Sequence, residues 1–331
     1  MSHFAIAGIQ MHVGMEDNSD LMRQRLNLLM HLYPWTEMVL FSELCAHGPQ
    51  PASAEKAGGA YEEALSSMAL KHKLWIVGGS YFEKADGALY NTTPVIGPNG
   101  EVVTRYRKMF PFTPFENETT PGSDFCVFDV PEVGRFGVSI CYDVWFPEVT
   151  RTLVAMGAEV ILNPVLAHFV DRDMDLVVAR ASAAMFQSYV FHINGTGAGG
   201  NGQSIVADPS GRILHQAGVS DELIPVEVDL DLVRRQRERG LRNMGQPLKS
   251  FRDSQTNFSV YDRARFDHSY LQSLGPLAKP ARAALAAGGE PESADVTTMA
   301  STSVLDAAVM VDDVPPSPAA EIPKGHRVTG D

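Results

Sequence analysis

The architecture of this chain is organised around residues 136–148, which read Phe136-Gly137-Val138-Ser139-Ile140-Cys141-Tyr142-Asp143-Val144-Trp145-Phe146-Pro147-Glu148. The first five residues form an apolar run typical of a buried strand, and a helix is predicted over Pro147–Met156. Cys141 therefore lies where a strand turns toward a helix, a place where helix N-terminal amides stabilise a thiolate. An isolated cysteine there is more often a small core residue. This segment alone leaves both interpretations open.

Two other predicted strands also end in a charged side chain. Residues 38–43 end in Glu43, and residues 102–108 end in Lys108. The ends of strands are where α/β proteins keep their chemistry. If these two ends converge on Cys141, a base, a cation and a nucleophile come together as a catalytic set.

The rest of the sequence alternates short β-branched or aromatic runs with helical stretches. Strands are predicted over Phe4–Met11, Glu37–Ser42, Leu74–Phe82, Leu89–Ile96, Glu101–Tyr106, Arg135–Ile140, Glu159–Leu162, Tyr189–Ile193, Ser204–Ala207, Ile213–His215 and Ile224–Val228. Helices are predicted over Asp20–Tyr33, Ala60–His72, Pro147–Met156, Leu176–Phe186 and Leu230–Arg239. Hairpins mixed among β-α units indicate an α/β protein with a mixed sheet, or two sheets, and helices outside.

Composition narrows the class of protein. The chain has 331 residues, of which 44% are hydrophobic and 20% charged, as in a globular protein with a sizeable core. Its formal net charge of −13 gives a nucleic-acid partner no electrostatic support. No run approaches the roughly 20 apolar residues that span a bilayer, and residues 1–8 lack signal-peptide features. Three cysteines form no disulfide framework, which predicts a cytoplasmic protein.

The composition changes after about Leu274 to alanine, proline, glycine, serine and threonine. We therefore predict one domain over residues 1–273 and a tail over residues 274–331. Ala286–Asp295 and Pro315–Asp331 are typical of solvated chain. The apolar piece Val304–Val311 either docks on a neighbouring subunit or is the least polar part of a disordered tail.

Three ordered blocks resemble the signature of the nitrilase-like carbon–nitrogen hydrolases. They are Phe41-Ser42-Glu43, Tyr106-Arg107-Lys108, and Ile140-Cys141-Tyr142-Asp143 followed by Phe146-Pro147-Glu148. The late hairpin turn Asp208-Pro209-Ser210-Gly211 also fits, so the resemblance covers roughly residues 3–265. It implies an αββα sandwich of two mixed β-sheets flanked by helices, and in many members two subunits pair into an αββααββα dimer. Ser42 departs from the family, which usually has proline before the glutamate.

The chemistry of amide hydrolysis assigns roles to the three blocks. Cys141 attacks the carbonyl carbon and forms a thioester, and Glu43 takes the thiol proton, passes it to departing ammonia and then activates water. Lys108 stabilises the thiolate and the tetrahedral oxyanion, helped by the backbone N–H of Tyr142. The resemblance also implies a second glutamate in the loop before the cysteine. Glu116 fits its Pro-x-x-Pro-x-Glu frame, with Glu118 as the competitor.

The residues after the cysteine bear on the substrate. Nitrile-cleaving relatives usually have Trp-Glu there, whereas this chain has Tyr142-Asp143, which favours amides. Relatives that bind a substrate carboxylate often have arginine where this chain has Val144 and Trp145, which indicates a neutral or cationic substrate end. Trp145 either offers an aromatic face to that end or packs in the core. Tyr142, Trp145 and His168 are the predicted substrate-binding residues.

These patterns predict a cysteine-dependent amidase that releases ammonia from a small carboxamide, without a cofactor or metal, as a homodimer or higher oligomer. An N-carbamoyl amine hydrolase is the alternative, because the segment from Cys141 to Glu148 also resembles carbamoylputrescine amidases. A nitrilase is disfavoured. A papain-like hydrolase with His168 or His192 as base would make the Glu43 and Lys108 blocks coincidental.

Two further patterns are set aside. The glycine-rich residues 197–202 satisfy the dinucleotide-binding pattern, but a strand rather than a helix follows them. Residues 171–175 begin like a calcium loop, but Leu176 occupies the position that requires glycine.

Overall fold

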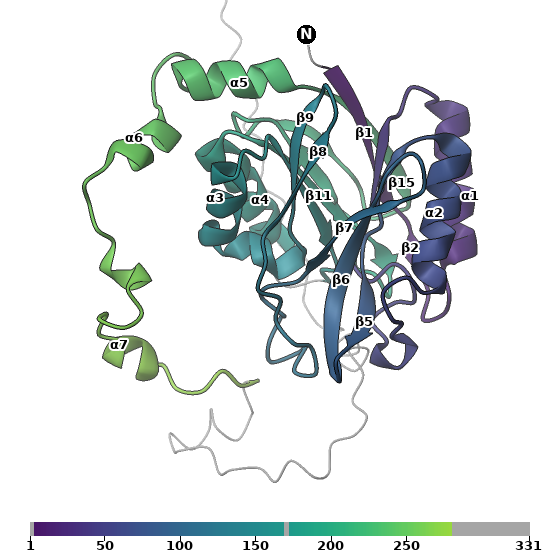
Figure 1. The fold of residues 1–331 in the computed structure, drawn as a ribbon, viewed down its shortest axis with the longest axis horizontal. Helices are drawn as coiled ribbons and strands as arrows, with labels where there is room; N and C mark the ends of the chain where they lie inside the picture. The colour runs from purple at the N-terminus through teal and green to yellow at the C-terminus, as the bar shows by residue number, and fades with distance from the viewer. Residues whose placement is uncertain (1–2, 169–171, 280–331) are drawn as a thin grey trace, which may run out of the picture.

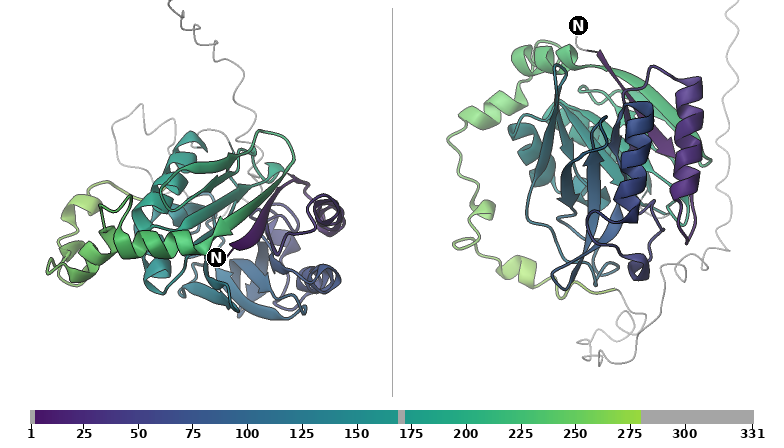
Figure 2. Two further views of the ribbon diagram at one scale, coloured as in Figure 1. Left: turned by 90° about the horizontal axis from the view of Figure 1, so that it is seen from above. Right: turned by 45° about the vertical axis from the view of Figure 1, so that its right-hand side comes forward.

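The computed structural model describes residues 3–168 and 172–279 (Figure 1). Two β-sheets lie face to face, with helices on the outer face of each (Figures 1 and 2). The predicted αββα sandwich of mixed sheets is therefore confirmed. No helix in the described part of the chain combines the length and apolar character needed to cross a membrane.

The first sheet has seven strands in the order β15-β1-β3-β4-β6-β5, with β7 also paired to β6. The neighbours β1, β3 and β4 are parallel, and the other pairs are antiparallel. Its strands are β1 (His3–Gln10), β3 (Met38–Phe41), β4 (Trp75–Val77), β5 (Tyr81–Ala85), β6 (Ala88–Ile96), β7 (Val102–Arg107) and β15 (Glu222–Asp229).

The second sheet has six strands in the order β14-β13-β11-β10-β9-β8. Its centre, β9 to β11, is parallel, and the outer pairs are antiparallel. The strands are β8 (Cys126–Val130), β9 (Gly134–Val138), β10 (Val160–Val165), β11 (Tyr189–Asn194), β13 (Ile205–Ala207) and β14 (Ile213–Gln216). A small parallel pair joins β2 (His12–Val13) to β12 (Thr196–Gly197).

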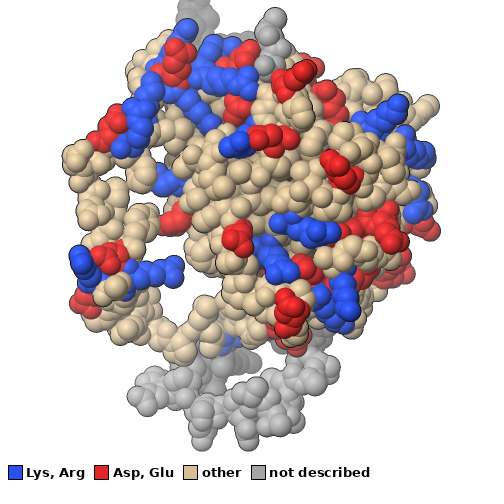
Figure 3. Space-filling view, viewed as in Figure 1, with Lys and Arg blue, Asp and Glu red and all other residues tan. Residues whose placement is uncertain are grey.

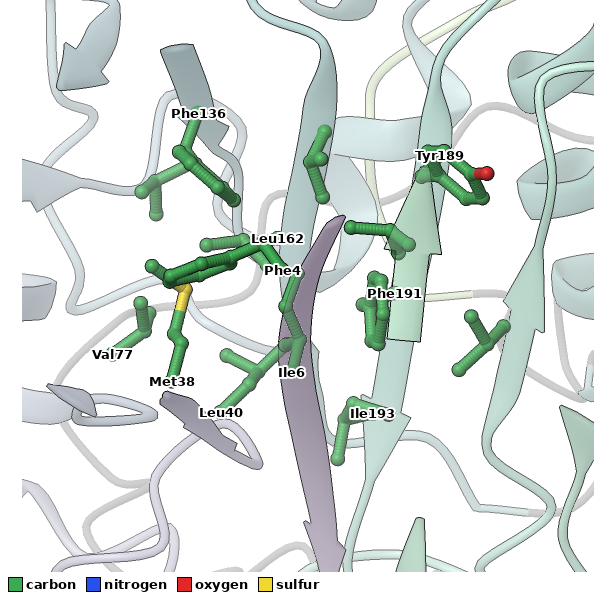
Figure 4. Close-up of a cluster of buried hydrophobic side chains, with 14 of the residues drawn as sticks. Phe4, Ile6, Met38, Leu40, Val77, Phe136, Leu162, Tyr189, Phe191 and Ile193 are labelled. Carbon is green, nitrogen blue, oxygen red and sulfur yellow. The ribbon is translucent and has the colours of Figure 1, made fainter. Parts of the chain in front are cut away.

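The central strands of each sheet, such as β3, β10 and β11, are buried on both faces, which explains their near-continuous apolar sequences. In β1, Phe4 and Ile6 enter the core between the sheets, whereas Ala7 and Ile9 enter the core under the helices. Figure 4 shows the core between the sheets, where Ile6 and Ile193 come from opposite sheets. The sheets approach so closely at Gly8 that a Cβ there would lie 2.3 Å from the Ile193 side chain.

Two pairs of helices cover the sandwich. On the first sheet lie α1 (Ser19–Leu32) and α2 (Ala60–His72), and on the second lie α3 (Pro147–Ala155) and α4 (Arg172–Phe186) (Figure 1). Helix α5 (Leu230–Arg239) follows β15; the Asp229 side chain accepts a hydrogen bond from the amide of Asp231, and the helix ends at Gly240. Such an N-cap side chain satisfies one of the otherwise unpaired first-turn amides.

Residues 241–279 form an extended arm outside the sandwich, with α6 (Pro247–Asp253) and α7 (Ser269–Gln272) as its helices. The arm runs around the α3 side of the molecule, and Figure 3 shows openings between it and the body. It carries many exposed apolar side chains: Phe251, Phe258, Val260, Tyr261, Tyr270, Leu271, Leu274 and Leu277. The arm touches the body where Arg151 lies 4.3 Å from the Phe251 ring and where Lys279 lies 4.5 Å from the Phe115 ring.

The structure differs from the sequence predictions at several elements. The strand predicted over Leu74–Phe82 is two strands, because Gly78 and Gly79 interrupt it; Gly79 has a φ of +64° and packs against the Ser42 carbonyl. Strand β8 was not predicted. The helix predicted from Leu176 includes residues from Arg172 onward. The predicted tail segments between residues 286 and 331 lie outside the described residues, so the boundary after residue 273 stays a prediction.

Candidate active site

The ends of β3, β7 and β9 meet between the two sheets, which brings Glu43, Lys108 and Cys141 to one place. Lys108 Nζ donates to Glu43 Oε1 at 2.8 Å, and both side chains are almost completely buried. Cys141 comes from the opposite sheet, and its thiol lies close enough to Glu43 that burial and this carboxylate together raise the pKa of the thiol. The predicted convergence of three strand ends is thus present in the structure. Ser42 is buried beside Glu43 and does not disturb these contacts.

The turn after β9 holds Cys141 in an unusual backbone conformation. Cys141 begins the 3₁₀ turn η2 (Cys141–Trp145) with a φ of +44°, a left-handed value that costs a non-glycine residue energy. Asp143 fixes this turn, because its carboxylate accepts from the Ile140 amide at 2.9 Å, the Tyr106 hydroxyl at 2.7 Å and the Phe110 amide at 2.9 Å. Burial raises the pKa of Asp143 to about 6. The three hydrogen bonds of Asp143 therefore hold Cys141 in place despite its unfavourable backbone conformation.

Glu116 is the second carboxylate of the cluster. Its Oε2 accepts from Lys108 Nζ at 2.6 Å and from the Phe112 amide at 2.5 Å. Asn91 bridges the two carboxylates, because its Nδ2 donates to Glu43 at 2.8 Å and to Glu116 at 3.3 Å. Glu118 is exposed. The geometry therefore joins Glu116, and not Glu118, to the lysine.

The electrostatics of the cluster keep the thiol protonated at rest. Burial and the charge of Glu43 raise the pKa of Cys141 well above its usual value, although Lys108 opposes them. Burial also raises the pKa of Glu43. Burial disfavours charged Lys108 as well, but the two carboxylates outweigh it and raise its pKa, while Lys108 in turn lowers that of Glu116. The structure thus places a buried lysine between two carboxyl groups and beside a buried thiol.

The residue after β10 makes backbone contacts with both Glu43 and Cys141. The amide of Leu166 donates to Glu43 Oε2 at 2.8 Å, and the carbonyl of Leu166 accepts from Cys141 Sγ at 3.6 Å. Sequence reasoning missed Leu166 because its contribution comes from backbone atoms, which carry no residue-type signal. Asn91 was also missed, since an asparagine inside a strand is not by itself a functional pattern.

Aromatic side chains line the turn beside the cysteine. Tyr142 meets Phe112 and Phe146 edge to face, with ring centroids 5.0 and 5.1 Å apart, and lies 6.4 Å from the Trp145 ring. Trp145 is half-buried, and its Nε1 donates to Asp175 Oδ1 at 2.6 Å. Its indole orientation is therefore fixed by a hydrogen bond. His168 is half-buried next to residues outside the described part, and its place in the pocket stays a prediction.

The structure argues against His192 as a base for Cys141. His192 is buried, its Nε2 accepts from Arg172 at 2.8 Å, and its Nδ1 lies 2.6 Å from Asn163 Oδ1. Burial and the charge of Arg172 hold its pKa well below the usual range. Both ring nitrogens are thus occupied. Across residues 3–168 and 172–279, no group of three histidine, cysteine or acidic side chains is arranged to hold a metal.

Comparison with known proteins agrees with this geometry. The sequence model of the carbon-nitrogen hydrolase family matches residues 6–238. This chain belongs to the carbon-nitrogen hydrolase family. Among curated relatives of this carbon-nitrogen hydrolase, the omega-amidase NIT2 of Bos taurus is 30% identical over 259 residues, covering 70% of this chain and 90% of the relative. The omega-amidase NIT2-A of Xenopus laevis is 32% identical, covering 59% of this chain and 79% of its own.

Solved structures extend the comparison. Nit3 of Saccharomyces cerevisiae, a member of the nitrilase superfamily, matches with a TM-score of 0.67 and 25% identity over 72% of this chain and 94% of its own. A cysteine-to-alanine mutant of the amidase from Nesterenkonia AN1, of the same superfamily, gives a TM-score of 0.63 and 25% identity over 73% and 97%. The present carbon-nitrogen hydrolase is therefore an enzyme that hydrolyses carbon–nitrogen bonds and has a nitrilase-superfamily fold.

Proposed function

We propose that this enzyme is a cysteine-dependent amidase that releases ammonia from a small carboxamide through a thioester intermediate, with Cys141, Glu43, Lys108 and Glu116 as its catalytic residues. The observation that carries the proposal is the buried Lys108 ammonium bonded to both Glu43 and Glu116 beside the Cys141 thiol. The names of the relatives, omega-amidases and an amidase, support the reaction class.

The first step is coupled proton transfer and attack. The thiol proton moves to Glu43 as Sγ bonds to the carbonyl carbon, and the carbonyl π electrons move to the oxygen. With both carboxyl groups ionised, Glu43, Glu116, Lys108 and the neutral Cys141 thiol together carry one net negative charge. Moving the proton from Cys141 to Glu43 therefore creates no additional buried charge. The raised pKa of Glu43 suits this group to take the proton and give it up again.

The later steps reuse the same carboxyl group. Glu43 gives its proton to the departing nitrogen, the carbon–nitrogen bond breaks, and ammonia leaves a thioester. Glu43 then removes a proton from water, whose oxygen attacks the thioester carbon. The carbon–sulfur bond breaks as Glu43 returns this proton to sulfur, which restores the thiol and releases the carboxylic acid. Lys108 and the backbone N–H of Tyr142 stabilise the oxyanion of each tetrahedral intermediate. Lys108 stays charged throughout because two carboxylates raise its pKa.

The surroundings of the site support a neutral or cationic substrate. Lys108 is already bonded to two carboxylates, so its charge is balanced before any substrate enters. Trp145 stands where carboxylate-binding relatives often have arginine, and it is held by the acidic Asp175. Arg172 already balances the charge of Asp175 at 3.4 Å, so the aromatic face of Trp145 itself is what suits an aliphatic or cationic group. The aromatic face of Trp145 also favours an N-carbamoyl amine as the second candidate substrate. Tyr142 and His168 are further proposed pocket residues.

The test is ammonia release over a panel of neutral, cationic and anionic carboxamides, N-carbamoyl amines and nitriles, with Cys141→Ala as control. We expect turnover of neutral or cationic carboxamides that is absent in the control. Turnover of N-carbamoyl amines alone would establish the second candidate. Turnover restricted to nitriles or to anionic amides would contradict the proposed substrate class.

Glu116 and Glu118 provide a matched pair of substitutions in one loop. Glu116→Gln removes a charge bonded to Lys108, so we expect kcat to fall by about 10²-fold or more. Glu118→Gln changes an exposed side chain and should leave kcat within about twofold. Steady-state kinetics on the same amide compares the two. Equal losses, or a greater loss for Glu118→Gln, would contradict the assignment.

We also propose that the enzyme assembles as a homodimer or higher homo-oligomer. The arm of residues 241–279 carries large apolar side chains that its own body leaves exposed, among them Tyr270 and Leu277. Burial against a second copy would remove this surface from water. Light scattering that gave the mass of one chain at micromolar concentration would contradict the proposal.

A further inference from the structure

Asn194, the last residue of β11, uses its buried side chain to hold the strand end beside it. Its Oδ1 accepts from the Ala167 amide at 3.0 Å, and its Nδ2 donates to the Ala167 carbonyl at 2.9 Å. The same Nδ2 donates to the Gly202 carbonyl at 2.8 Å. One amide side chain therefore fixes both backbone groups of Ala167, the residue directly after Leu166.

The glycine-rich segment that resembled a nucleotide-binding pattern closes around this contact. The amide of Asn201 donates to the Ala167 carbonyl at 3.0 Å. Gly200 has a φ of +132°, and a Cβ there would lie 2.4 Å from Asn194 Oδ1 and 2.7 Å from the Ala167 carbonyl oxygen. Only glycine leaves room for the side chain of Asn194 at this point. The glycine-rich segment therefore makes room for the Asn194 side chain, whereas the glycines of a dinucleotide-binding loop make room for a phosphate.

Ser204 and Gln10, both buried, also hold Asn194 in place. Its backbone amide donates to Ser204 Oγ at 2.9 Å, and Ser204 Oγ donates to Gln10 Oε1 at 2.8 Å. Gln10 belongs to β1 of the first sheet, whereas Asn194 belongs to the second. The contact network therefore spans both halves of the sandwich.

We infer that Asn194 and the segment Gly199–Gly202 form a clamp that positions Leu166, and through it sets the alignment of Glu43 with Cys141. Leu166 contacts both groups through its backbone, so a shift of Ala167 moves the donor to the Glu43 carboxylate and the acceptor of the Cys141 thiol together. Asn194 is a positioning residue, and this inference rests on the proposed roles of Glu43 and Cys141.

The test is Asn194→Ala together with the milder Ser204→Ala, which removes the hydroxyl that holds the Asn194 amide, each measured for kcat, KM, the pH profile of kcat/KM and thermal unfolding. Misplacement by a fraction of an ångström should lower kcat by about 10- to 100-fold with little change in KM. A carboxylate that loses a hydrogen-bond donor has a higher pKa. The acidic limb of the profile, which reports Glu43, should therefore move to higher pH in both variants.

Two controls separate positioning from simple stability. Gly218→Ala adds a methyl group where nothing lies within 4 Å and should match the parent enzyme. Asn163→Ala removes another fully buried asparagine of the same sheet, bonded to His192 and Ser139 and not to Ala167. It should lower the unfolding temperature without moving the acidic limb.

The outcomes distinguish the clamp from the catalytic assignment. If Asn194→Ala fails to fold, Ser204→Ala carries the test, and the pH dependence of Cys141 alkylation by iodoacetamide reports alignment without turnover. Folded variants with an unmoved acidic limb, or losses equal to those of Asn163→Ala, would overturn the clamp. Retained turnover in Cys141→Ala would instead overturn the proposed function.

Discussion

Cys141→Ala is expected to reduce amide turnover to the background rate while leaving the fold intact. The substitution removes the atom that forms the thioester, and no other group in the described cluster replaces a sulfur nucleophile. The turn should persist because Asp143 holds it through the Ile140 and Phe110 amides, which the substitution does not touch. Ammonia release and circular dichroism measured on the same sample test both parts.

The other cysteines supply the matched control. Burial raises the pKa of Cys45 to about 12 and that of Cys126 to about 11. Unlike that of Cys141, their thiols contact Tyr61 and Thr104 rather than a carboxylate and a lysine. Cys126→Ala should keep turnover near the parent value, with a modest loss of stability from the buried site. Residual activity above a few per cent in Cys141→Ala would exclude the thioester route.

Lys108→Met is expected to be nearly inactive, with kcat lowered by about 10²- to 10³-fold or more. Methionine occupies a similar volume but removes the cation that opposes the high pKa of the Cys141 thiol. Lys84→Met, in an exposed position on β5, is the matched control and should retain the parent rate. Parent-like kinetics in Lys108→Met would contradict the electrostatic role of the lysine.

The same variant should show a distinctive dependence of stability on pH. Without Lys108, Glu43 and Glu116 are buried carboxylates without a counter-ion, so their folded-state pKa values rise above those of the unfolded chain. Stability is then fully present at low pH and is lost as pH rises through the raised values. The unfolding temperature of Lys108→Met should therefore fall further below the parent as pH increases from about 5 to about 8. A gap independent of pH would mean that the two carboxylates are paired elsewhere.

The sequence predicted the site where residue type and strand position coincide. Glu43, Lys108 and Cys141 each follow a predicted strand, which marked them as candidates, but their meeting between two different sheets is known only from the fold. Leu166 and Asn194 act through or upon backbone atoms. The partners that matter here, Glu43 and Cys141 for Leu166 and Ala167 for Asn194, are more than 20 residues away, so no local pattern marks them. The choice of Glu116 over Glu118 needed the loop conformation, which places one carboxylate on Lys108 and the other in solvent.

The sequence also predicted those helices and strands whose ends are marked by local signals, and it missed features that depend on contacts distant in sequence. Ala60–His72 and Leu230–Arg239 have the predicted bounds because their start and stop signals are local. The interruption between β4 and β5 was missed because Gly79 is required by a neighbour distant in sequence, the Ser42 carbonyl. Tertiary contacts of this kind override the apolar pattern of a single segment.

The proposed catalytic groups lie in both halves of the sandwich. Glu43, Lys108 and Asn91 follow or belong to strands of the first sheet, whereas Cys141 and Leu166 follow strands of the second. Activity should therefore depend on how the two sheets are positioned relative to each other. The close approach of Gly8 to Ile193 helps to set that position. We expect a larger side chain at Gly8 or a changed one at Ile193 to alter the gap between Glu43 and Cys141. The reaction rate would then depend on apolar residues outside the candidate active site.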